Sequence, residues 1–380
     1  MDCHWFKTNH CRSCELLDHS YEETLRMKEA KLTSLFPGIE RVMKPTVALG
    51  ANVAGSRNKA KLAAFPNGHD IQFGFYDNAL HFKDLESCPL HMPELNEILP
   101  ILKNKLKEFK IIPYSVTEKK GELKYLILSK SESHDEMLLR FVLRSKESLD
   151  RLKKMAKILQ DEMPSIKVIT ANFQSEHKAI FEGDEEIVLT ENSHILNTFG
   201  DVNLTLGPRS FFQVTPEIAG RLYQNVGDVV RDLKVTSFLD LFCGVGAFSF
   251  FAAKNCPKVY GVEISKEAIE CAKSSISLNK INGEIKFEAL DVEEYLKTKK
   301  EKFDAILVNP PRRGLNNSII QNIMENDPRV IIYSSCNAET LARDFEILEE
   351  KYDISHAQIY DMFPNTTHFE TLMILNRKGV

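Results

Sequence analysis

The sequence lacks any apolar run long enough to cross a membrane, and its amino terminus has no apolar core of the signal-peptide kind. It also lacks internal repeats and low-complexity tracts. Net positive charge is missing too: the formal charge of −5 disfavours nucleic-acid binding by bulk charge and leaves room only for a local basic patch. With 43% hydrophobic and 27% charged residues, the 380 residues indicate a globular protein of two or three domains, which we expect to be cytoplasmic and to bind no membrane.

Four of the eight cysteines form an amino-terminal group, and in a cytoplasmic chain such groups indicate metal binding or catalysis rather than disulfides. Cys3, Cys11 and Cys14 have the spacing C-x7-C-x2-C, and Cys88 lies far downstream, directly before a proline. Cys-x-x-Cys brings two sulfurs to one metal, and a proline after the last cysteine occurs in iron–sulfur proteins, so four thiolates suit a 4Fe-4S cluster. Zinc stays an alternative because two histidines neighbour these cysteines, and four unrelated thiols are the third possibility.

A stretch rich in cations and aromatic residues follows the first cysteines. Arg57, Lys59 and Lys61 place three cations within five residues, and the run FGFY at 73–76 comes shortly after. Cations contact phosphates and aromatic rings stack on bases in proteins that bind single-stranded RNA. A solvated charged face would have the same pattern, so we treat these three residues as candidates for RNA binding.

The pattern of apolar residues changes near residue 203. Before it, expected helices over 21–36, 95–109 and 148–162 and a strand over 137–144 indicate a mixed sheet with helices. After it, a long helix leads into alternating strands and helices, which is typical of a Rossmann-like α/β domain. We predict regions 1–92, 93–203 and 204–380, although a segment of the first half could fold back onto the last region.

A glycine-rich turn opens the α/β region. The run FLDLFCGVGAF at 238–248 predicts a strand, a turn containing Gly244 and then a helix, and glycine lets the backbone approach a ligand closely. The next strand ends at Glu263, whose carboxylate could accept hydrogen bonds from ribose hydroxyls. Two more strands end at Asp291 and Asn309. Polar residues at these strand ends outline one ligand crevice.

Two common cofactor classes are disfavoured by the sequence. The glycine-rich turn lacks the three-glycine fingerprint of dinucleotide dehydrogenases, and the chain has no Gly-Lys-Ser/Thr of a kinase-like P-loop. DLFCGVGAF, the acid at the second strand end and the run NPP at 309–311 instead resemble the S-adenosylmethionine-dependent methyltransferases. In members that methylate exocyclic amines an aromatic residue follows the prolines, whereas Arg312 stands there here, which counts against amine methylation.

Cys336 follows a β-branched run at 330–333, where a strand opens into a loop. Ligands bind at this edge of α/β sheets, so Cys336 is a candidate nucleophile, with a buried structural thiol as the alternative. A ring carbon such as C5 of uracil becomes nucleophilic after a thiolate adds to C6, and a base must then remove the C5 proton. Glu370 is the candidate base if burial raises its pKa; His368 competes for the role, and a surface carboxylate is the alternative.

Five motifs together, SSCNAET, NPPRRG, DLFCGVG, GPRSFFQ and DMFPNTTHFE, resemble the RNA uracil-C5 methyltransferase family. The runs CRSC, RNKAK, GELKY and MLLRFVLRS are similar to its members that act on 23S ribosomal RNA. The resemblance runs from Cys3 to the last strand, and we see no TRAM domain. It implies a Rossmann-like methyltransferase domain with an amino-terminal α+β domain for iron–sulfur binding and RNA recognition.

The resemblance also implies a role for individual residues. Cys336 would be the nucleophile and Glu370 the base. Contacts to S-adenosylmethionine would come from Gln213, Phe242, Glu263 and Asn309. The ligands of the 4Fe-4S cluster would be Cys3, Cys11, Cys14 and Cys88. Gly244 and Asp291 are added to the cofactor site from the order of the strands alone.

We therefore expect an enzyme that methylates C5 of a flipped-out uridine in a single-stranded loop or bulge of 23S ribosomal RNA and acts as a monomer. The cluster would be structural, because this chemistry has no redox step. One alternative is the same chemistry on transfer RNA or on another ribosomal uridine. The other is a non-catalytic RNA-binding or iron–sulfur scaffold.

Overall fold

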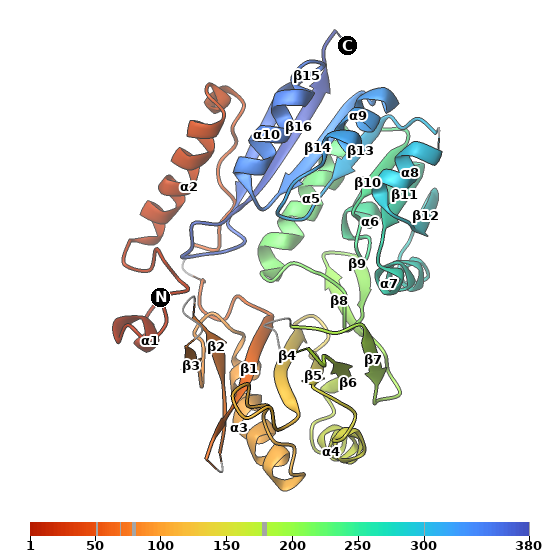
Figure 1. Cartoon of the computed structure of the whole chain (residues 1–380). Helices are drawn as coiled ribbons and strands as arrows, with labels where there is room; N and C mark the ends of the chain where they lie inside the picture. Colours follow the sequence, from red (N-terminus) through yellow and green to blue (C-terminus); the bar gives the residue numbers. More distant parts are fainter. Residues whose placement is uncertain (51, 69, 78–80, 177–180, 300, 380) are drawn as a thin grey trace. The chain divides into compact units, whose positions relative to one another are not determined.

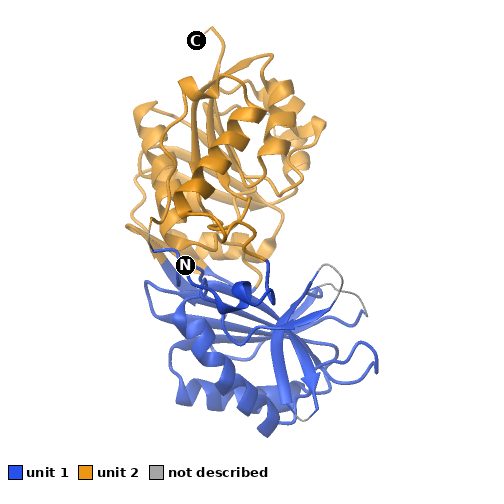
Figure 2. Cartoon of the chain, turned by 90° about the vertical axis from the view of Figure 1, so that its left-hand side faces the viewer, with its two compact units in different colours: residues 1–12, 52–197, 206–208 blue, residues 13–51, 198–205, 209–380 orange. Residues whose placement is uncertain are grey.

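The computed structural model describes the chain except for residues 51, 69, 78–80, 177–180, 300 and 380 (Figure 1). The described chain forms two compact units, coloured separately in Figure 2. Unit 1 comprises Met1–Arg12, Asn52–Asn197 and Leu206–Pro208, and unit 2 comprises Ser13–Ala51, Thr198–Thr205 and Arg209–Val380. An early segment therefore does fold with the last region. The ranges 1–92, 93–203 and 204–380 stay predictions about function, because the units reflect packing alone.

Unit 1 contains a seven-stranded mixed sheet in the order β3-β2-β1-β4-β5-β6-β7. Its strands are β1 (Lys59–Asn67), β2 (Asp70–Tyr76), β3 (Phe82–Asp84), β4 (Leu123–Ser131), β5 (Glu136–Leu143), β6 (Ile166–Phe173) and β7 (Glu185–Val188). Its helices are α1 (His4–Lys7), α3 (Pro93–Glu108) and α4 (Leu149–Glu162). Neighbouring strands are antiparallel except β5 and β6, which run parallel because α4 carries the chain across between them. The expected mixed sheet and its two long helices are confirmed.

The core of unit 1 forms between this sheet and helices α3 and α4. On α3, five apolar residues recur at helical spacing on the buried face: Leu95, Ile98, Leu99, Leu102 and Leu106. Phe73 of β2 points into the same core and has 0% exposure. Phe73, from the aromatic run that follows the candidate cations, is therefore not available to stack on bases, because alternate residues of a strand face opposite sides and this one faces the helices.

Unit 2 contains a second seven-stranded sheet in the order β12-β11-β10-β13-β14-β16-β15. Its strands are β10 (Phe238–Leu241), β11 (Lys258–Glu263), β12 (Glu284–Ala289), β13 (Ala305–Val308), β14 (Val330–Ser335), β15 (Tyr352–Tyr360) and β16 (Glu370–Arg377). Strands β10 to β14 are parallel, and β16 lies antiparallel between β14 and β15. The strand order reverses between β10 and β13, which is where α/β sheets bind ligands at the carboxyl ends of the strands. The predicted Rossmann-like fold is confirmed.

Helices cover both faces of the unit 2 sheet (Figure 1). They are α5 (Pro216–Asp232), α6 (Ala247–Ala253), α7 (Lys266–Ile276), α8 (Val292–Thr298), α9 (Asn317–Asn326) and α10 (Ala338–Leu348). The short strands β8 (Ile195–Phe199) and β9 (Val202–Leu206) form a separate two-stranded sheet. No helix among the described residues has both the length and the apolar character needed to cross a membrane.

The amino-terminal part of unit 2 is helix α2 (Tyr21–Leu35), followed by the short helix η1 (Ile39–Arg41). Ser20 begins α2 with a capping box, in which Ser20 and Glu23 each bond the other's backbone amide. Leu32 is fully buried and belongs to the same apolar core as α8, α9 and α10. Helix α2 is therefore part of the methyltransferase-like core, although about 200 residues separate it from that region in sequence.

Candidate active site

Cys336 lies between the end of β14 and the start of α10, and it is half-buried. Strand β14 is buried throughout and ends in Ser334 and Ser335. Helix α10 begins at Ala338 because the Asn337 side chain accepts hydrogen bonds from the amides of residues 339 and 340, at 3.1 and 3.5 Å. The strand and the cap together hold the thiol at the carboxyl edge of the parallel sheet.

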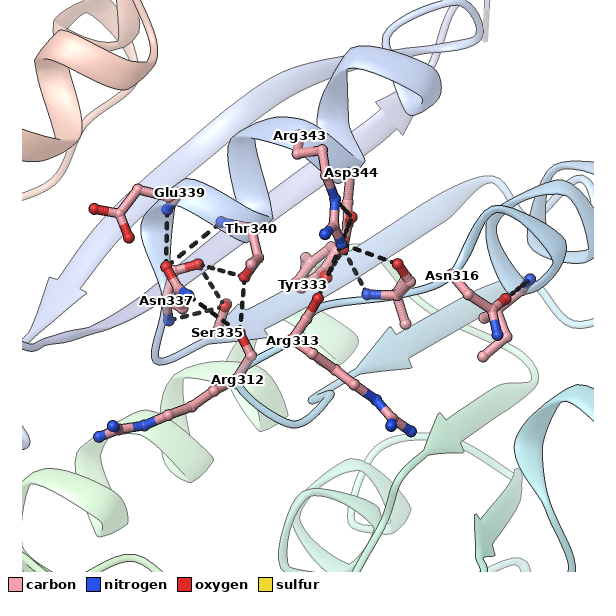
Figure 3. Close-up of polar contacts among 12 residues, drawn as sticks. Arg312, Arg313, Asn316, Tyr333, Ser335, Asn337, Glu339, Thr340, Arg343 and Asp344 are labelled. Atoms are coloured by element: carbon pink, nitrogen blue, oxygen red, sulfur yellow. Dashed lines mark hydrogen bonds and ion pairs between the residues drawn. The ribbon is translucent and has the colours of Figure 1, made fainter.

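The loop after Asn309-Pro310-Pro311 is tied to the first turns of α10 (Figure 3). Asn337 Nδ2 donates a hydrogen bond to the Arg312 carbonyl at 3.1 Å, and Thr340 Oγ1 donates to the same oxygen at 3.3 Å. One turn on, Arg343 donates to the Arg313 carbonyl at 3.0 Å. These contacts hold the backbone of Arg312, and its guanidinium interacts with the Cys336 thiol.

Gly314 lets this loop pass close to α10. Its φ is +72°, and a Cβ at this position would lie 2.7 Å from the carboxylate of Asp344 and 2.7 Å from the guanidinium of Arg343. Asp344 is buried and accepts hydrogen bonds from the Leu315 amide at 2.7 Å and from the Tyr333 hydroxyl at 2.6 Å. A side chain at 314 would therefore push against an ordered carboxylate.

Neighbouring groups shift the pKa of the Cys336 thiol in opposite directions. Burial raises the pKa of its thiol and the Glu370 carboxylate raises it further, whereas the charge and hydrogen bond of Arg312 lower it. The thiolate is the nucleophilic form of cysteine. Arg312 therefore favours the reactive thiolate form of Cys336. In the sequence, Arg312 is notable only because it stands where an aromatic residue follows the prolines in amine methyltransferases.

Glu370 is the first residue of β16 and is 1% exposed, so its alternative role as a surface carboxylate is wrong. Its Oε1 accepts hydrogen bonds from the Ser334 hydroxyl at 2.6 Å and from Asn309 Nδ2 at 3.1 Å. Burial raises the pKa of Glu370 to about 7, although both hydrogen bonds oppose this rise. A carboxylate with this pKa suits a general base near neutral pH.

A small pocket of about 120 Å³ opens beside Cys336. Its lining comes from four parts of unit 2: helix α2, the loop after β13, the start of α10 with the residues just before it, and the segment that precedes β16. The lining residues are Lys31, Arg312, Cys336, Asn337, Ala338, Glu339, Thr367, His368 and Phe369. Burial and Arg312 lower the pKa of His368, so its imidazole is mainly neutral at pH 7 and it remains a candidate base. Nothing in the sequence indicated that Lys31 of α2 lines this pocket.

The predicted cofactor residues of the glycine loop come together at the ends of β10 and β11. Glu263 Oε2 accepts a hydrogen bond from the Gly244 amide at 3.3 Å, and its Oε1 accepts one from the Ser265 amide at 2.9 Å. Phe242 has a φ of +63°, a strained conformation for a non-glycine residue that costs on the order of 1–3 kcal/mol and is typical of functional loops. Asp240 of β10 was missed: its Oδ2 accepts a hydrogen bond from Ser249 at 2.6 Å, and burial raises its pKa to about 7.

Three further predicted residues occupy different surroundings. Asn309 bridges two strands, because its amide donates to the Ser334 carbonyl and to Glu370, both at 3.1 Å. Gln213 is 5% exposed in the loop between β9 and α5. Asp291 is exposed and caps helix α8 by accepting hydrogen bonds from the amides of residues 293 and 294. Cofactor contacts from these residues stay predictions.

The four amino-terminal cysteines are half-buried and form no disulfide. Within unit 1, Trp5 Nε1 donates to the Ser87 carbonyl at 2.7 Å, and His10 Nε2 lies 2.7 Å from the Asp84 carbonyl, so the first residues are fastened next to Cys88. Burial raises the pKa of Cys88, and Cys11 is near enough to raise it further. Among the residues that the structure describes, however, no three His, Cys, Asp or Glu side chains form a group that could hold a metal ion.

The three candidate RNA-binding residues lie on and just before β1 in unit 1. Arg57 is half-buried, and its Nε has no hydrogen-bond partner among the described residues. Burial, with Lys61 and Arg140 nearby, lowers the pKa of Lys59 to about 8. Lys61 is exposed, lies 3.5 Å from Glu182 and sits over the ring of Phe181, at 5.5 Å from its centre. A role in RNA binding stays a prediction for all three.

Known proteins resemble this chain over nearly its full length. The family described as tRNA (Uracil-5-)-methyltransferase matches residues 20–378. Two proteins named 23S rRNA (uracil(747)-C(5))-methyltransferase RlmC are similar: that of Xenorhabdus nematophila is 38% identical over 99% of each chain, and that of Salmonella typhimurium is 39% identical over 99% of this chain and all of its own.

A solved structure extends the likeness to three dimensions. It is the tRNA (uracil-54, C5)-methyltransferase of Pyrococcus abyssi in complex with S-adenosyl-L-homocysteine, with a TM-score of 0.79 and 27% identity over 95% of this chain and 85% of that one. The family match covers far more than half of the chain. The chain therefore belongs to the tRNA (uracil-5-)-methyltransferase family, as its motifs predicted.

Proposed function

We propose that this enzyme transfers a methyl group from S-adenosylmethionine to C5 of a uridine in 23S ribosomal RNA, with Cys336 as nucleophile and Glu370 as base. The observation that carries this proposal is the buried Glu370, with a pKa of about 7, close enough to Cys336 to perturb its thiol beside a small pocket. A nucleophile and a separate base are what methylation of an unactivated ring carbon needs.

In the proposed reaction, the thiolate of Cys336 forms a bond to C6 of the uracil, and the electron pair of the C5–C6 double bond moves to C5. C5 takes the methyl group as the bond between sulfonium and methyl breaks, which leaves neutral S-adenosylhomocysteine. Glu370 then removes the C5 proton. The electron pair released there restores the double bond and expels the Cys336 thiolate, so the enzyme returns to its starting state after the proton leaves Glu370.

The methyl donor would bind at the ends of β10 and β11. Glu263 and Gly244 lie together there, and the backbone strain at Phe242 supports a functional loop. Bound S-adenosyl-L-homocysteine in the Pyrococcus abyssi relative supports the same cofactor class. Gln213, Asn309 and Asp291 complete the set of contacts that we propose.

We propose ribosomal RNA as the substrate because relatives that match the chain over nearly its full length, among them those of Xenorhabdus nematophila and Salmonella typhimurium, are named for it. Transfer RNA is the second candidate, since the solved relative and the family description name it. In either RNA the uridine must leave the stack, because C5 and C6 are not accessible within it. Arg57, Lys59 and Lys61 of unit 1 would contact the phosphates around a single-stranded loop or bulge.

The test offers the protein unmodified 23S RNA and transfer RNA, each tritiated at uridine C5, with S-adenosylmethionine labelled in its methyl group. Methylation of 23S RNA with release of tritium is expected. Cys336→Ala should abolish both, whereas Glu370→Gln should block tritium release and leave a methylated covalent adduct between Cys336 and the RNA. Cys256→Ala is the matched control, because Cys256 lies near the amino end of β11, at the opposite edge of the sheet. Methylation without tritium release would contradict C5 chemistry, and a scaffold protein would give neither.

We also propose that Cys3, Cys11, Cys14 and Cys88 hold a 4Fe-4S cluster with a structural role. The donors fit such a group in chemistry, since all four are unbridged thiols and Cys11 lies near Cys88. Iron and acid-labile sulfide in the anaerobically purified protein, lost in Cys88→Ser together with folding or RNA binding, would support it. Zinc alone would favour the alternative metal, and a Cys88→Ser protein that folds and binds RNA without turnover would contradict a structural role.

A further inference from the structure

The segment at 361–369 connects β15 to β16 and leads directly into Glu370. It begins at Asp361, which is 0% exposed. Asp361 Oδ1 lies 2.5 Å from the ammonium of Lys28, and its Oδ2 accepts a hydrogen bond from the Tyr21 hydroxyl at 2.6 Å. Both partners belong to α2, more than 330 residues earlier in the sequence. A buried ion pair thus fastens the start of the base-bearing segment to the amino-terminal helix.

Lys28 also contacts the backbone of this segment. Its ammonium donates a second hydrogen bond to the Phe363 carbonyl at 3.0 Å, and the same oxygen accepts one from Thr366 Oγ1 at 2.9 Å. The Lys28 side chain is only 1% exposed. The buried ammonium of Lys28 therefore holds both the start of the segment 361–369, at Asp361, and its backbone at Phe363.

Further backbone contacts complete this anchorage. The Asp361 amide donates to the Val47 carbonyl at 2.8 Å, and the Asn365 carbonyl accepts from the Leu16 amide at 3.0 Å. The Met362 carbonyl accepts a hydrogen bond from the Thr215 hydroxyl at 2.8 Å. Most of these partners lie within residues 13–51, so the amino-terminal segment of unit 2 sets the conformation of the segment that precedes Glu370.

Apolar packing could have joined α2 to the sheet more cheaply, because two charges taken out of water lose their hydration. Breaking such a pair leaves an uncompensated charge, so the pair tolerates few geometries. We propose that Lys28, Asp361 and Tyr21 form a positioning device that orients the carboxylate of Glu370 toward the C5 proton of the substrate. This inference rests on the proposed function, in which Glu370 acts after the covalent bond has formed.

That order of events separates positioning from mere structural support. If the device only stabilises the fold, its loss lowers adduct formation and proton removal in the same proportion. If it orients Glu370, the Cys336–RNA adduct still forms and methylation still follows, but proton removal slows and the adduct accumulates. The ratio of the two rates is therefore the informative quantity.

The experiment compares Tyr21→Phe, Lys28→Met and Arg26→Met in single turnovers, with whichever C5-tritiated RNA, 23S or transfer RNA, the unchanged protein accepts. Arg26 is an exposed cation on the same helix, so Arg26→Met is the matched control. Covalent adduct is measured on denaturing gels, tritium release in solution and folding by thermal unfolding. Tyr21→Phe removes a single hydroxyl and keeps the test valid if Lys28→Met does not fold.

We expect Lys28→Met to form adduct at the normal rate and to release tritium about tenfold more slowly or worse, with a smaller effect of the same kind in Tyr21→Phe. Arg26→Met should match the unchanged protein. The inference alone would be overturned if adduct formation and tritium release slowed to the same extent, or if neither Lys28→Met nor Tyr21→Phe slowed either step. No tritium release by the unchanged protein from either RNA would overturn the proposed function and this inference with it.

Discussion

Ser334→Ala should shift the pH dependence of catalysis, because Ser334 stabilises the charged form of Glu370. Its hydroxyl donates a 2.6 Å hydrogen bond to Glu370 Oε1, and both residues are buried. A hydrogen bond to a charged group contributes about 1.5–3 kcal/mol. One pKa unit corresponds to about 1.4 kcal/mol. Loss of this bond should therefore raise the pKa of Glu370 from about 7 by about one to two units.

The effect on rate follows from the ionised fraction of Glu370. For a rise of about one unit, that fraction at about pH 7 falls from about one half to about one tenth, so proton removal slows about fivefold. The difference in the rate of proton removal between Ser334→Ala and the unchanged protein should disappear near pH 9, where the Glu370 carboxylate is ionised in both. Single-turnover tritium release from C5-labelled RNA, measured across pH, reports this step.

The control is Ser355→Ala, which removes a hydroxyl that donates to the Ile374 carbonyl in the same sheet. It should leave the acid limb of the pH profile unchanged. An acid limb that does not move in Ser334→Ala would refute the assignment of that limb to Glu370. A loss of equal size at every pH would refute the hydrogen bond as its cause.

Three other substitutions probe the same site. The pKa of Glu370 is raised from 4.5 to about 7, so its contribution to stability is complete below about pH 4.5 and is lost as the pH rises through about 7. Glu370→Gln should therefore remove up to about 3 kcal/mol of this pH dependence, measured by urea unfolding. Gly314→Ala should destabilise by about 1 kcal/mol or more beyond Gly38→Ala in the same assay, because both glycines have positive φ but only Gly314 meets a neighbour within 4 Å. Arg312→Met should raise the pKa of Cys336 and slow its alkylation by iodoacetamide near neutral pH, with Cys336→Ala as the blank.

Each of these expectations has a clear contrary result. Glu370→Gln could lose stability with rising pH as steeply as the unchanged protein, which would mean that Glu370 is not the titrating group. Equal unfolding midpoints for Gly314→Ala and Gly38→Ala would mean that the loop after β13 moves aside freely. An alkylation rate that does not depend on Arg312 would mean that the guanidinium does not act on the thiol.

The carboxyl ends of the parallel strands of the methyltransferase-like sheet could be predicted within about two residues because of how these strands are buried, whereas β15 was not predicted. A parallel strand covered on both faces is a continuous run of β-branched and apolar residues, and β14 ends where serines replace that run. The end of β11 at Glu263 and the position of Asn309 directly after β13 followed in the same way. Strand order then brought these side chains to one edge, as expected for this sheet class.

Contacts between distant segments could not be predicted in this way. Asn309 and Glu370 are 61 positions apart, and nothing local marks Ser334 as the donor that shares this carboxylate. The inward side of β2 could not be predicted either, and only the structure shows that Phe73 faces the core. The alternation of side chains along a strand defines two faces but does not say which one is buried. That depends on which face the helices cover.

The sequence by itself determined the family and the α/β class, and it indicated Cys336 and Glu370 as candidate catalytic residues, because motifs and apolar periodicity are local properties of the chain. Only the tertiary structure decided that α2 belongs to unit 2, where Lys28 meets Asp361 across 333 positions. It also decided that Glu370 is buried away from water, which raises its pKa to about 7. The physical reason is the same in both cases: desolvation depends on every segment that surrounds a group, and no single stretch of sequence carries that information.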